Sequence, residues 1–458
     1  MDCIMTGPLI LKFGGTSLDD AEALERLAGI VSSRREAQPV VVVSAMRGVT
    51  DALLEGTELA RDGQVGRAYN RIEGQIGRYA SVGARLLDAD AADELDAVVS
   101  AAALEITDLL RVVSLHPGTL SPLRDEIVSY GERLSSRLVA HVLASRGVPA
   151  RRMDARRCIV TDEDHGKATP NARLTTECTV RELQPVLAAG EVPVLGGFIG
   201  AAENGATTTL GRGGSDYTAA LVGSALHATE IQIWTDVTGF LSADPRVVPD
   251  AHSIPHLSYA EAAELAYFGA KVLHPKTIQP AVECGIPVRV CNSHQPDAPG
   301  TLIDNDPVET PGGAKAIAHK PGITLIQVAS ARMLGAYGFL KAIFEVFARH
   351  RTAIDVVTTS EVSVSLSVED VHSLPGIVEE LSAIGTVRVE SGYSVICVVG
   401  EGLRYTAGLP ARVFGTLGEV DVAIISQGAS SINLTFVVPE IAAVPTVRRL
   451  HAEFFGEP

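Results

Sequence analysis

Short apolar runs alternate with longer amphipathic segments over the first two thirds of the chain. Four of these runs are bounded by Gly, Pro, Ser or Thr, and we expect them to be buried strands: 8–13, 40–43, 192–195 and 231–234. Helical periodicity is found in the segments 19–33, 51–113, 127–145 and 217–226. Strands that alternate with helices predict an α/β fold, in which a mainly parallel sheet is flanked by helices.

The rest of the chain has a different pattern and contains an internal repeat. Residues 293–315 are rich in Pro, Gly and Asp, which predicts a domain boundary. Beyond it, residues 342–344 match 412–414 and residues 360–366 match 430–436, both with an offset of 70 (412 − 342 and 430 − 360). Each copy has the pattern of strand, helix, strand, strand, so we predict two small ferredoxin-like βαββ modules.

We therefore expect three domains. Residues 1–300 would form the α/β domain, and residues 316–392 and 393–458 would each form one βαββ module. Paired modules of this kind are more typical of sensing domains than of a catalytic unit.

The overall composition excludes several classes of protein. With 46% hydrophobic residues, the 458-residue chain can bury large cores and is not a disordered protein. Its net charge of −17 argues against binding to bulk nucleic acid or to anionic membrane surfaces. An anionic ligand must therefore meet Lys and Arg residues that are concentrated locally.

The cysteines and the N-terminus indicate a cytoplasmic protein. The six cysteines are scattered and form no CxxC motif, as expected of reduced thiols in a reducing compartment. The N-terminus lacks the basic region and the long apolar run of a signal peptide. Because no apolar run approaches the ~20 residues that span a bilayer, we expect a soluble protein.

Two glycine-rich stretches carry the candidate chemistry, residues 12–17 (KFGGTS) and 209–216 (TLGRGGSD). In each stretch, glycines leave backbone N–H groups accessible beside one cation, Lys12 or Arg212. Backbone N–H groups and a nearby cation together can bind phosphate or carboxylate oxygens. Neither stretch matches the P-loop or the dinucleotide-binding fingerprint. Together they favour transfer of a phosphoryl group to a small acidic molecule, although Lys12 alone could be a surface lysine before a turn.

The residues around these stretches suit an amino-acid substrate. Such a site needs a guanidinium for the carboxylate and an acid for the ammonium group. Arg212 offers the first and Glu132, on a predicted helix, offers the second, although Glu132 could equally be an ordinary surface acid. Asp216 could orient Lys12, cap the helix 217–226, or do both.

Further polar residues follow the predicted strands. Ser44 and Thr50 come after the second strand, where their hydroxyls could bind substrate or cap the next helix. Asp236 follows the fourth strand and could bind ribose hydroxyls, while Arg246 and Lys271 could bind phosphates. Because ligand sites in open α/β sheets lie at the carboxyl ends of strands, we expect one shared site.

Taken in order, these motifs closely resemble those of the aspartokinases, which belong to the amino-acid-kinase family. The matching motifs run along almost the whole chain: KFGGTS, SYGERLSS, TTLGRGGSD, ADPR and FGAKVLHP in the first part, and MLGAYGFL, TTSEVSVSL and ISQGASSINLTFVV in the tail. The resemblance implies ATP-dependent phosphorylation of the side-chain carboxylate of L-aspartate to 4-phospho-L-aspartate, the first step towards lysine, threonine and methionine. It also implies that the tail forms two ACT domains, the feedback sensors of the family.

The resemblance also implies roles for individual residues. Lys12 would stabilise the transferred phosphoryl group, and Asp216 would orient Lys12. Aspartate would be held by Ser44, Thr50, Glu132 and Arg212. The ATP site would be lined by Lys12, Phe13, Gly14, Gly15, Thr235, Asp236, Arg246 and Lys271. Mg²⁺ would be carried on the phosphates rather than in a metal site of the protein.

One position departs from the family pattern. Leu241 stands where many relatives carry a Tyr that contacts the nucleotide. The departure weakens any claim about contacts with the adenine ring and leaves the phosphate side unaffected.

The resemblance further implies a regulatory site for lysine or threonine in the first ACT domain. Its residues would be Met333, Ala336, Phe339, Leu340, Ile354, Asp355, Thr359, Ser360 and Glu361. Asp355 and Glu361 could receive the ammonium groups of the ligand, or they could simply face solvent. The ACT domains would also mediate a homodimer or a higher homo-oligomer, and we expect no fused homoserine dehydrogenase.

Two other functions stay open at this stage. A kinase for another acid, such as acetylglutamate or glutamate, would share the first domain, but those relatives generally lack paired ACT domains. A catalytically silent amino-acid sensor would share the tail, but Lys12, Arg212 and Asp216 are all present. An assay of ATP turnover with aspartate separates these functions.

Overall fold

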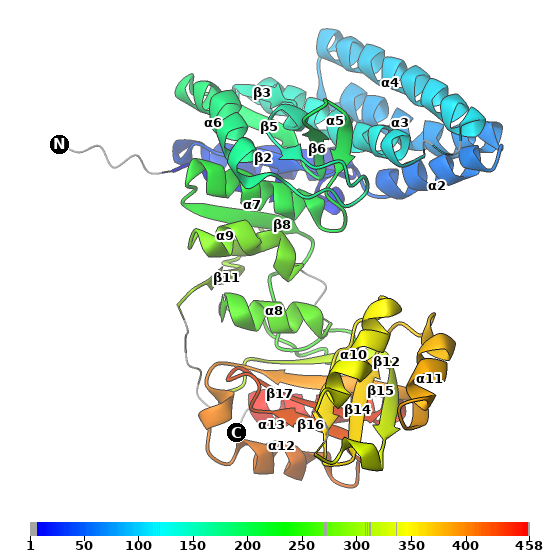
Figure 1. Cartoon of the computed structure of the whole chain (residues 1–458). Coiled ribbons are helices and arrows are strands. Elements are labelled where there is room, and N and C mark those ends of the chain that lie inside the picture. Colours follow the sequence, from blue (N-terminus) through cyan, green and yellow to red (C-terminus); the bar gives the residue numbers. More distant parts are fainter. Residues whose placement is uncertain are drawn as a thin grey trace. The chain divides into compact units, whose positions relative to one another are not determined.

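The computed structural model describes residues 7–116, 118, 120–269, 273–306, 308, 310, 313–335 and 337–456 (Figure 1). Its contacts divide the chain into two compact units. The first unit comprises Met1–Phe240 and Val272–Asn305, and the second comprises Leu241–Lys271 and Asp306–Pro458. The segment 241–271 thus groups with the second unit, whereas the sequence placed it inside a continuous first domain; the domain limits themselves stay a prediction.

A mainly parallel sheet forms the centre of the first unit. Seven of its strands follow the order β3-β5-β2-β1-β8-β10-β11; the strands from β3 to β10 are parallel, and β11 runs antiparallel to β10. Their bounds are β1 Leu9–Phe13, β2 Val40–Val43, β3 Ala150–Met153, β5 Val192–Gly196, β8 Glu230–Thr235, β10 Val288–Asn292 and β11 Thr301–Asp304. Every residue of β1, β2 and β5 is buried, which explains why these strands are continuous apolar runs.

Helices flank this sheet, and α2, α3 and α4 lie beside one another (Figure 1). The helices of the first unit are α1 Ala21–Ser33, α2 Val49–Arg61, α3 Val65–Leu86, α4 Ala89–Leu115, α5 Leu120–Ser145, α6 Ala172–Ala188, α7 Gly214–Leu226 and α9 Gln279–Glu283. A separate small sheet contains β4 Val160–Thr161, β6 Ile199–Ala202 and β7 Thr207–Thr209. Together these elements confirm the expected α/β fold.

The second unit contains one antiparallel sheet with the strand order β13-β14-β12-β15-β17-β16. The strands of this sheet are β12 Ala316–Ala329, β13 Val357–Thr359, β14 Ser363–Val368, β15 Thr386–Val399, β16 Ile424–Gln427 and β17 Asn433–Pro439. The short strand β9 His256–Ser258 also belongs to the second unit but is not part of this sheet. The helices of the second unit are α8 Tyr259–Tyr267, α10 Phe339–Arg349, α11 Leu374–Ser382, α12 Leu409–Leu417 and α13 Glu440–Phe455.

The repeat found in the sequence is present in this unit. The elements β12, α10 and β14 begin 70 residues before β15, α12 and β17 (386 − 316, 409 − 339 and 433 − 363). Each copy continues into one more helix, α11 or α13, which the sequence analysis did not predict. Each copy is therefore βαββα, and the predicted βαββ order is the first part of it.

Two helices begin at least three residues before the position that the sequence predicted. The helix expected over 127–145 begins at Leu120, and Pro122 lies in its first turn, where proline is tolerated. The helix expected to follow Asp216 begins at Gly214, and its N-cap is Gly213 in a left-handed conformation (φ 73°). Asp216 lies in the first turn, so its interpretation as the N-cap is wrong.

Two further findings concern the described part of the chain. Its five cysteines are free thiols. None of its helices is both long and apolar enough to cross a membrane.

Candidate active site

The end of β1 presents an ion pair between Lys12 and Asp216. Lys12 is the fourth residue of β1 and is buried, and its Nζ lies 2.7 Å from Oδ1 of Asp216 in the first turn of α7. The carboxylate of Asp216 also lies in the first turn of α7, at the positive end of the helix dipole. The pair therefore holds one ammonium group in place at the carboxyl edge of the sheet.

Glu132 is buried on α5 rather than exposed as a surface acid. Its Oε1 accepts a hydrogen bond from the backbone N–H of Ala45 at 3.1 Å, while Oε2 is buried without a hydrogen-bond partner. Burial raises the pKa of Glu132 to about 8. An unpaired carboxylate oxygen in such a place suits a ligand that brings an ammonium group.

Glycines allow α5 to approach the strand ends closely enough to place Glu132 there. A Cβ on Gly131 would lie 2.7 Å from the Cβ of Ala45, directly after β2. A Cβ on Gly196, at the end of β5, would lie 2.8 Å from the backbone oxygen of Glu132. Since real Cβ atoms do not approach so closely, any larger residue would push α5 away from the sheet.

A cavity of about 620 Å³ joins these groups. The predicted substrate residues Ser44, Thr50, Glu132 and Arg212 line it together with Lys12 and Asp216. Thr50 lies within α2, whose N-cap is Gly48 without a side-chain hydrogen bond, so neither Ser44 nor Thr50 caps that helix. The volume is in the range of small-molecule sites.

Sequence reasoning missed Asp125, which fixes one wall of the cavity. Its buried carboxylate accepts hydrogen bonds from the backbone N–H of Gly166 at 2.9 Å and from the N–H and Oγ1 of Thr209 at 3.0 and 2.9 Å. Nδ1 of His165 lies 3.1 Å away. The spacing 125, 128, 132 on one helix face was the available signal, because Val128 and Glu132 also line the cavity.

Two aromatic residues that the sequence analysis did not single out also shape the site. Tyr79 of α3 is fully buried; it accepts from the N–H of Met46 at 3.2 Å and donates to the oxygen of Gly131 at 2.9 Å. Phe198 lines the cavity with a positive φ of 66°. A non-glycine residue in that region is strained, and such strain is typical of functional sites.

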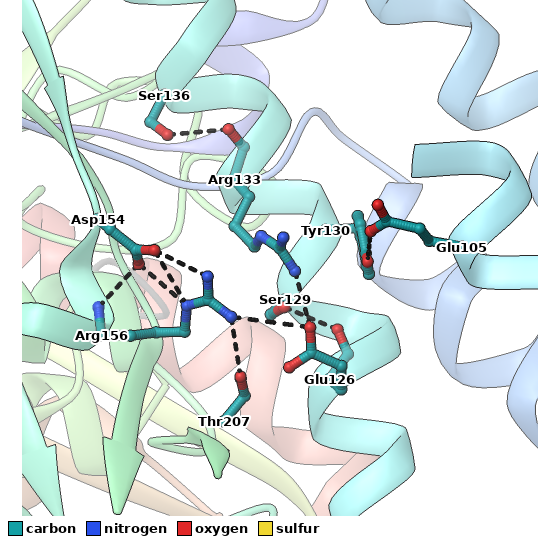
Figure 2. Close-up of polar contacts among 9 residues, drawn as sticks. All are labelled: Glu105, Glu126, Ser129, Tyr130, Arg133, Ser136, Asp154, Arg156 and Thr207. Carbon is teal, nitrogen blue, oxygen red and sulfur yellow. Dashed lines mark hydrogen bonds and ion pairs between the residues drawn. The ribbon is translucent and has the colours of Figure 1, made fainter. Parts of the chain in front are cut away.

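A polar network on another part of α5 ties this helix to its neighbours (Figure 2). Arg133 pairs with Glu126 on the helix at 2.8 Å. Arg156 pairs with Asp154 at 2.7 Å, lies 3.7 Å from Glu126, and donates to Thr207 of β7 at 3.2 Å. The network therefore connects α5 with β7, the strand whose last residue contacts Asp125.

The predicted ATP residues near β1 differ in what they offer. The Phe13 side chain is fully buried and stacks on Trp234 at 6.1 Å between ring centroids, so only its backbone is available for a ligand. Gly14 donates to the oxygen of Trp234 at 3.1 Å. A Cβ on Gly15 would lie 2.8 Å from the oxygen of Ala45, so this loop packs closely on the end of β2.

Thr235 and Asp236 stand at the end of β8, next to β1. Thr235 donates to Oδ1 of Asp236 at 3.2 Å and accepts from the N–H and Oγ of Ser293 at 2.8 and 3.0 Å. Ser17 in turn donates to Ser293 at 3.1 Å. The ends of β1, β8 and β10 are thereby connected, through a serine that the sequence analysis did not identify.

The structure does not place the two other predicted phosphate-binding residues, Arg246 and Lys271, at this site. Arg246 belongs to the second unit, where its guanidinium is exposed and pairs with Asp244 at 2.7 Å. Lys271 lies outside the described residues. Both roles stay predictions.

The predicted regulatory residues lie around α10 and β13 in the second unit. Asp355 is buried, so the alternative that it simply faces solvent is wrong; its Oδ1 accepts from Tyr267 and lies 3.4 Å from Nζ of Lys320, and its Oδ2 is buried without a hydrogen-bond partner. Glu361 is exposed. Three others pack partly buried against the core of this module: Met333, Phe339 and Ile354.

The remaining regulatory candidates have ordinary surroundings. Leu340 is exposed at the start of α10, and Thr359 ends β13. The Ser360 hydroxyl accepts from the N–H of Ser363 at 3.1 Å and stabilises the turn between β13 and β14. Ala336 lies outside the described residues.

Comparisons with known proteins agree with this architecture. Residues 7–292 match the amino acid kinase family, and residues 396–454 match the ACT domain. Lysine-sensitive aspartokinase 3 of Escherichia coli is 39% identical over 98% of this chain and 100% of its own length. Aspartokinase 1 of Arabidopsis thaliana, a chloroplastic protein, is 37% identical over 97% of this chain and 80% of its own length.

Solved structures give the same result. The crystal structure of E. coli aspartokinase III in complex with aspartate and ADP has a TM-score of 0.83 and covers 98% of this chain and 100% of that chain. The structure of that enzyme in complex with lysine and aspartate has a TM-score of 0.81. This chain therefore belongs to the amino acid kinase family and, within it, to the aspartokinases.

Proposed function

We propose that this protein transfers the γ-phosphoryl group of ATP to the side-chain carboxylate of L-aspartate, which gives 4-phospho-L-aspartate. The observation that carries the proposal is the Lys12–Asp216 ion pair of 2.7 Å, in one cavity with Arg212 and the unpaired oxygen of Glu132. The related E. coli enzyme has been solved with aspartate and ADP, which supports the same pair of ligands here.

Each group in the cavity has a distinct role in this reaction. Lys12 neutralises charge on the transferred phosphoryl group, and Asp216 keeps its ammonium group in position. Arg212 binds the α-carboxylate of aspartate, and Glu132 receives its ammonium group. Ser44 and Thr50 complete the substrate pocket, and the loops with Gly14, Gly15, Thr235 and Asp236 line the ATP side.

The chemistry requires no general base. The attacking group is a carboxylate, which is already an anion and can attack the γ-phosphorus directly. Catalysis then consists of positioning two anions against each other and neutralising their charge. A buried ammonium group at the end of β1 supplies that neutralisation in a place with little water.

We propose that Mg²⁺ arrives with the nucleotide. Among the described residues, no group of three or more His, Cys, Asp or Glu side chains is arranged to hold a metal. Mg²⁺ usually keeps several waters and binds substrate phosphates with few protein ligands. When bound, it would neutralise charge on the phosphates of ATP.

The proposal is tested by measuring ADP release with Mg-ATP and L-aspartate and by trapping the acyl phosphate with hydroxylamine. Aspartate-dependent hydroxamate is the expected product. Hydroxamate from glutamate or acetylglutamate alone would indicate another acid substrate. Folded protein that turns over ATP with none of these acids would indicate a silent sensor.

We further propose feedback inhibition by lysine or threonine through the ACT region and a homodimer or higher homo-oligomer formed by it. Asp355 offers a buried carboxylate oxygen for an ammonium group, and the related E. coli enzyme has been solved with lysine. Exposed apolar side chains on this unit include Phe344, Val362 and Ile425. Light scattering after size exclusion measures the oligomer, and a monomer would contradict this part of the proposal.

A further inference from the structure

Arg124 places a second guanidinium on the wall of the substrate cavity. It lies near the start of α5, one residue before Asp125, and lines the cavity that Glu132 and Arg212 also line. Because the Asp125 carboxylate is fixed by hydrogen bonds to Gly166 and Thr209, this part of α5 is held against the cavity. The backbone at Arg124 is therefore held at the cavity wall.

The two guanidinium groups are carried by segments that meet at one residue. Nη2 of Arg124 lies so close to Gly166 that a Cβ there would be 2.5 Å from it. A Cβ on Gly211, the residue before Arg212, would lie 3.2 Å from the backbone oxygen of Gly166. Gly166 thus lies between the Arg124 side chain and the loop that carries Arg212, and both arginines line the cavity.

Among the described residues, the guanidinium groups of Arg124 and Arg212 have no protein partners, and acidic groups near them are already paired. Lys12 is paired with Asp216, and the oxygens of Asp125 are used by Gly166, Thr209 and His165. Neither Arg124 nor Arg212 has an ion pair or a side-chain hydrogen bond within the residues that the structure describes. Two free cations on one wall of a binding cavity favour an anionic group between them.

We propose that Arg124 is a substrate-binding residue that holds the α-carboxylate of the acidic substrate together with Arg212. The inference rests on the proposed function and makes it more specific. A carboxylate has enough lone pairs to accept hydrogen bonds from two guanidinium groups. In the proposed function, Lys12 contacts the phosphoryl group and Glu132 contacts the ammonium group. The α-carboxylate is therefore the substrate group that Arg124 and Arg212 would bind.

The test compares ligands with and without the α-carboxylate. The variants are Arg124→Gln and Arg124→Lys, with Arg137→Gln as the control on the same helix, where Arg137 lies 3.5 Å from Glu94. For each, we would measure the KM for L-aspartate, the KM for ATP, and the inhibition constant of L-aspartate α-amide, which is neutral at that carboxyl group. Hydroxamate formation is the readout.

We expect Arg124→Gln to raise the KM for aspartate about 10- to 100-fold, the scale of a lost hydrogen bond to a charged group. The inhibition constant of the α-amide and the KM for ATP should change less than about threefold, since neither ligand contacts this guanidinium. The KM of Arg124→Lys for aspartate should lie between those of Arg124→Gln and the wild type, because lysine keeps the positive charge but lacks the bidentate guanidinium. Arg137→Gln should resemble the wild type.

Two results would overturn the inference while the wild type remains an aspartokinase. One is an unchanged KM for aspartate in Arg124→Gln. The other is an equal rise for aspartate and its α-amide, which would mean that Arg124 only supports the packing around Gly166. A wild-type protein that forms no aspartate hydroxamate would instead remove the proposed function, and this inference with it.

Discussion

Lys12 is the residue on which the proposed chemistry depends most directly. If its ammonium group stabilises the phosphoryl group in transfer, Lys12→Ala should lower kcat by at least ~10²-fold, the scale of losing one charge stabiliser. Turnover of aspartate to hydroxamate measures this loss. Lys276→Ala, an exposed lysine of the same unit, is the matched control, and thermal melting checks that both variants are folded. Near-normal turnover in Lys12→Ala would contradict the proposed role of Lys12 in stabilising the phosphoryl group.

The buried carboxyl of Glu132 predicts a dependence of stability on pH. Its pKa is raised from 4.5 to about 8 by burial, so the folded protein keeps a proton that the unfolded chain releases. The contribution of Glu132 to the free energy of unfolding is therefore fully present below pH 4.5 and is lost as the pH rises towards 8. Glu132→Gln removes the effect, and it should gain stability relative to the wild type over this window, by roughly 1 kcal/mol per pH unit.

Melting curves without substrate from pH 5 to pH 9 measure this difference. Glu203→Gln replaces an exposed acid and should follow the wild type at every pH. A constant difference between Glu132→Gln and the wild type across the window would show that Glu132 is ionised in the free protein.

At the scale of elements, apolar runs predicted the central strands well, because a parallel strand covered on both faces has few alternatives. The four-valine run at 40–43 corresponds to β2 residue by residue. Capping and cavity walls were less predictable. Asp216 was open to interpretation as an N-cap because the left-handed Gly213 is not visible in a sequence. Arg124 carries no motif, and only the three-dimensional position of α5 shows its use; for Asp125 the helical spacing to Val128 and Glu132 was the one signal in the sequence.

The helix α8 depends on one buried ion pair in the second unit. Nζ of Lys315 lies 2.8 Å from Oε2 of Glu261, and both side chains are almost completely buried. Glu261 also accepts from the N–H of Ser258 and completes a capping box. Lys315→Ala would leave a buried charge without a partner, so we expect the free energy of unfolding to fall by about 3–5 kcal/mol.

Urea unfolding of the full chain measures this loss. Lys341→Ala removes an exposed lysine that pairs with Glu345 one helical turn away, and it should cost less than about 1 kcal/mol. Equal effects of the two variants would mean that burial adds nothing to the Lys315 pair.

At the scale of the whole molecule, the internal repeat predicted two modules but not the way in which they share structure. The long strands β12 and β15 pair with each other and continue from one copy into the next. Ile317 in the first part of β12 belongs to the core with Val398, whereas Ile326 in its second part belongs to the core with Val364. A sequence offset of 70 gives the copies, but it cannot show that one strand serves two cores.

The same unit allows a prediction about feedback. Tyr267 of α8 donates to Asp355, and Lys320 lies 3.4 Å from the same oxygen, so an inhibitor's ammonium group must share this carboxylate with both. We expect Asp355→Asn to raise the lysine concentration for half-inhibition at least about tenfold and Tyr267→Phe to lower it, since the second variant frees the carboxylate. The hydroxamate assay with increasing lysine measures both, with Asp370→Asn, an exposed acid of this unit, as control. Inhibition that is unchanged in Asp355→Asn would place the inhibitor elsewhere.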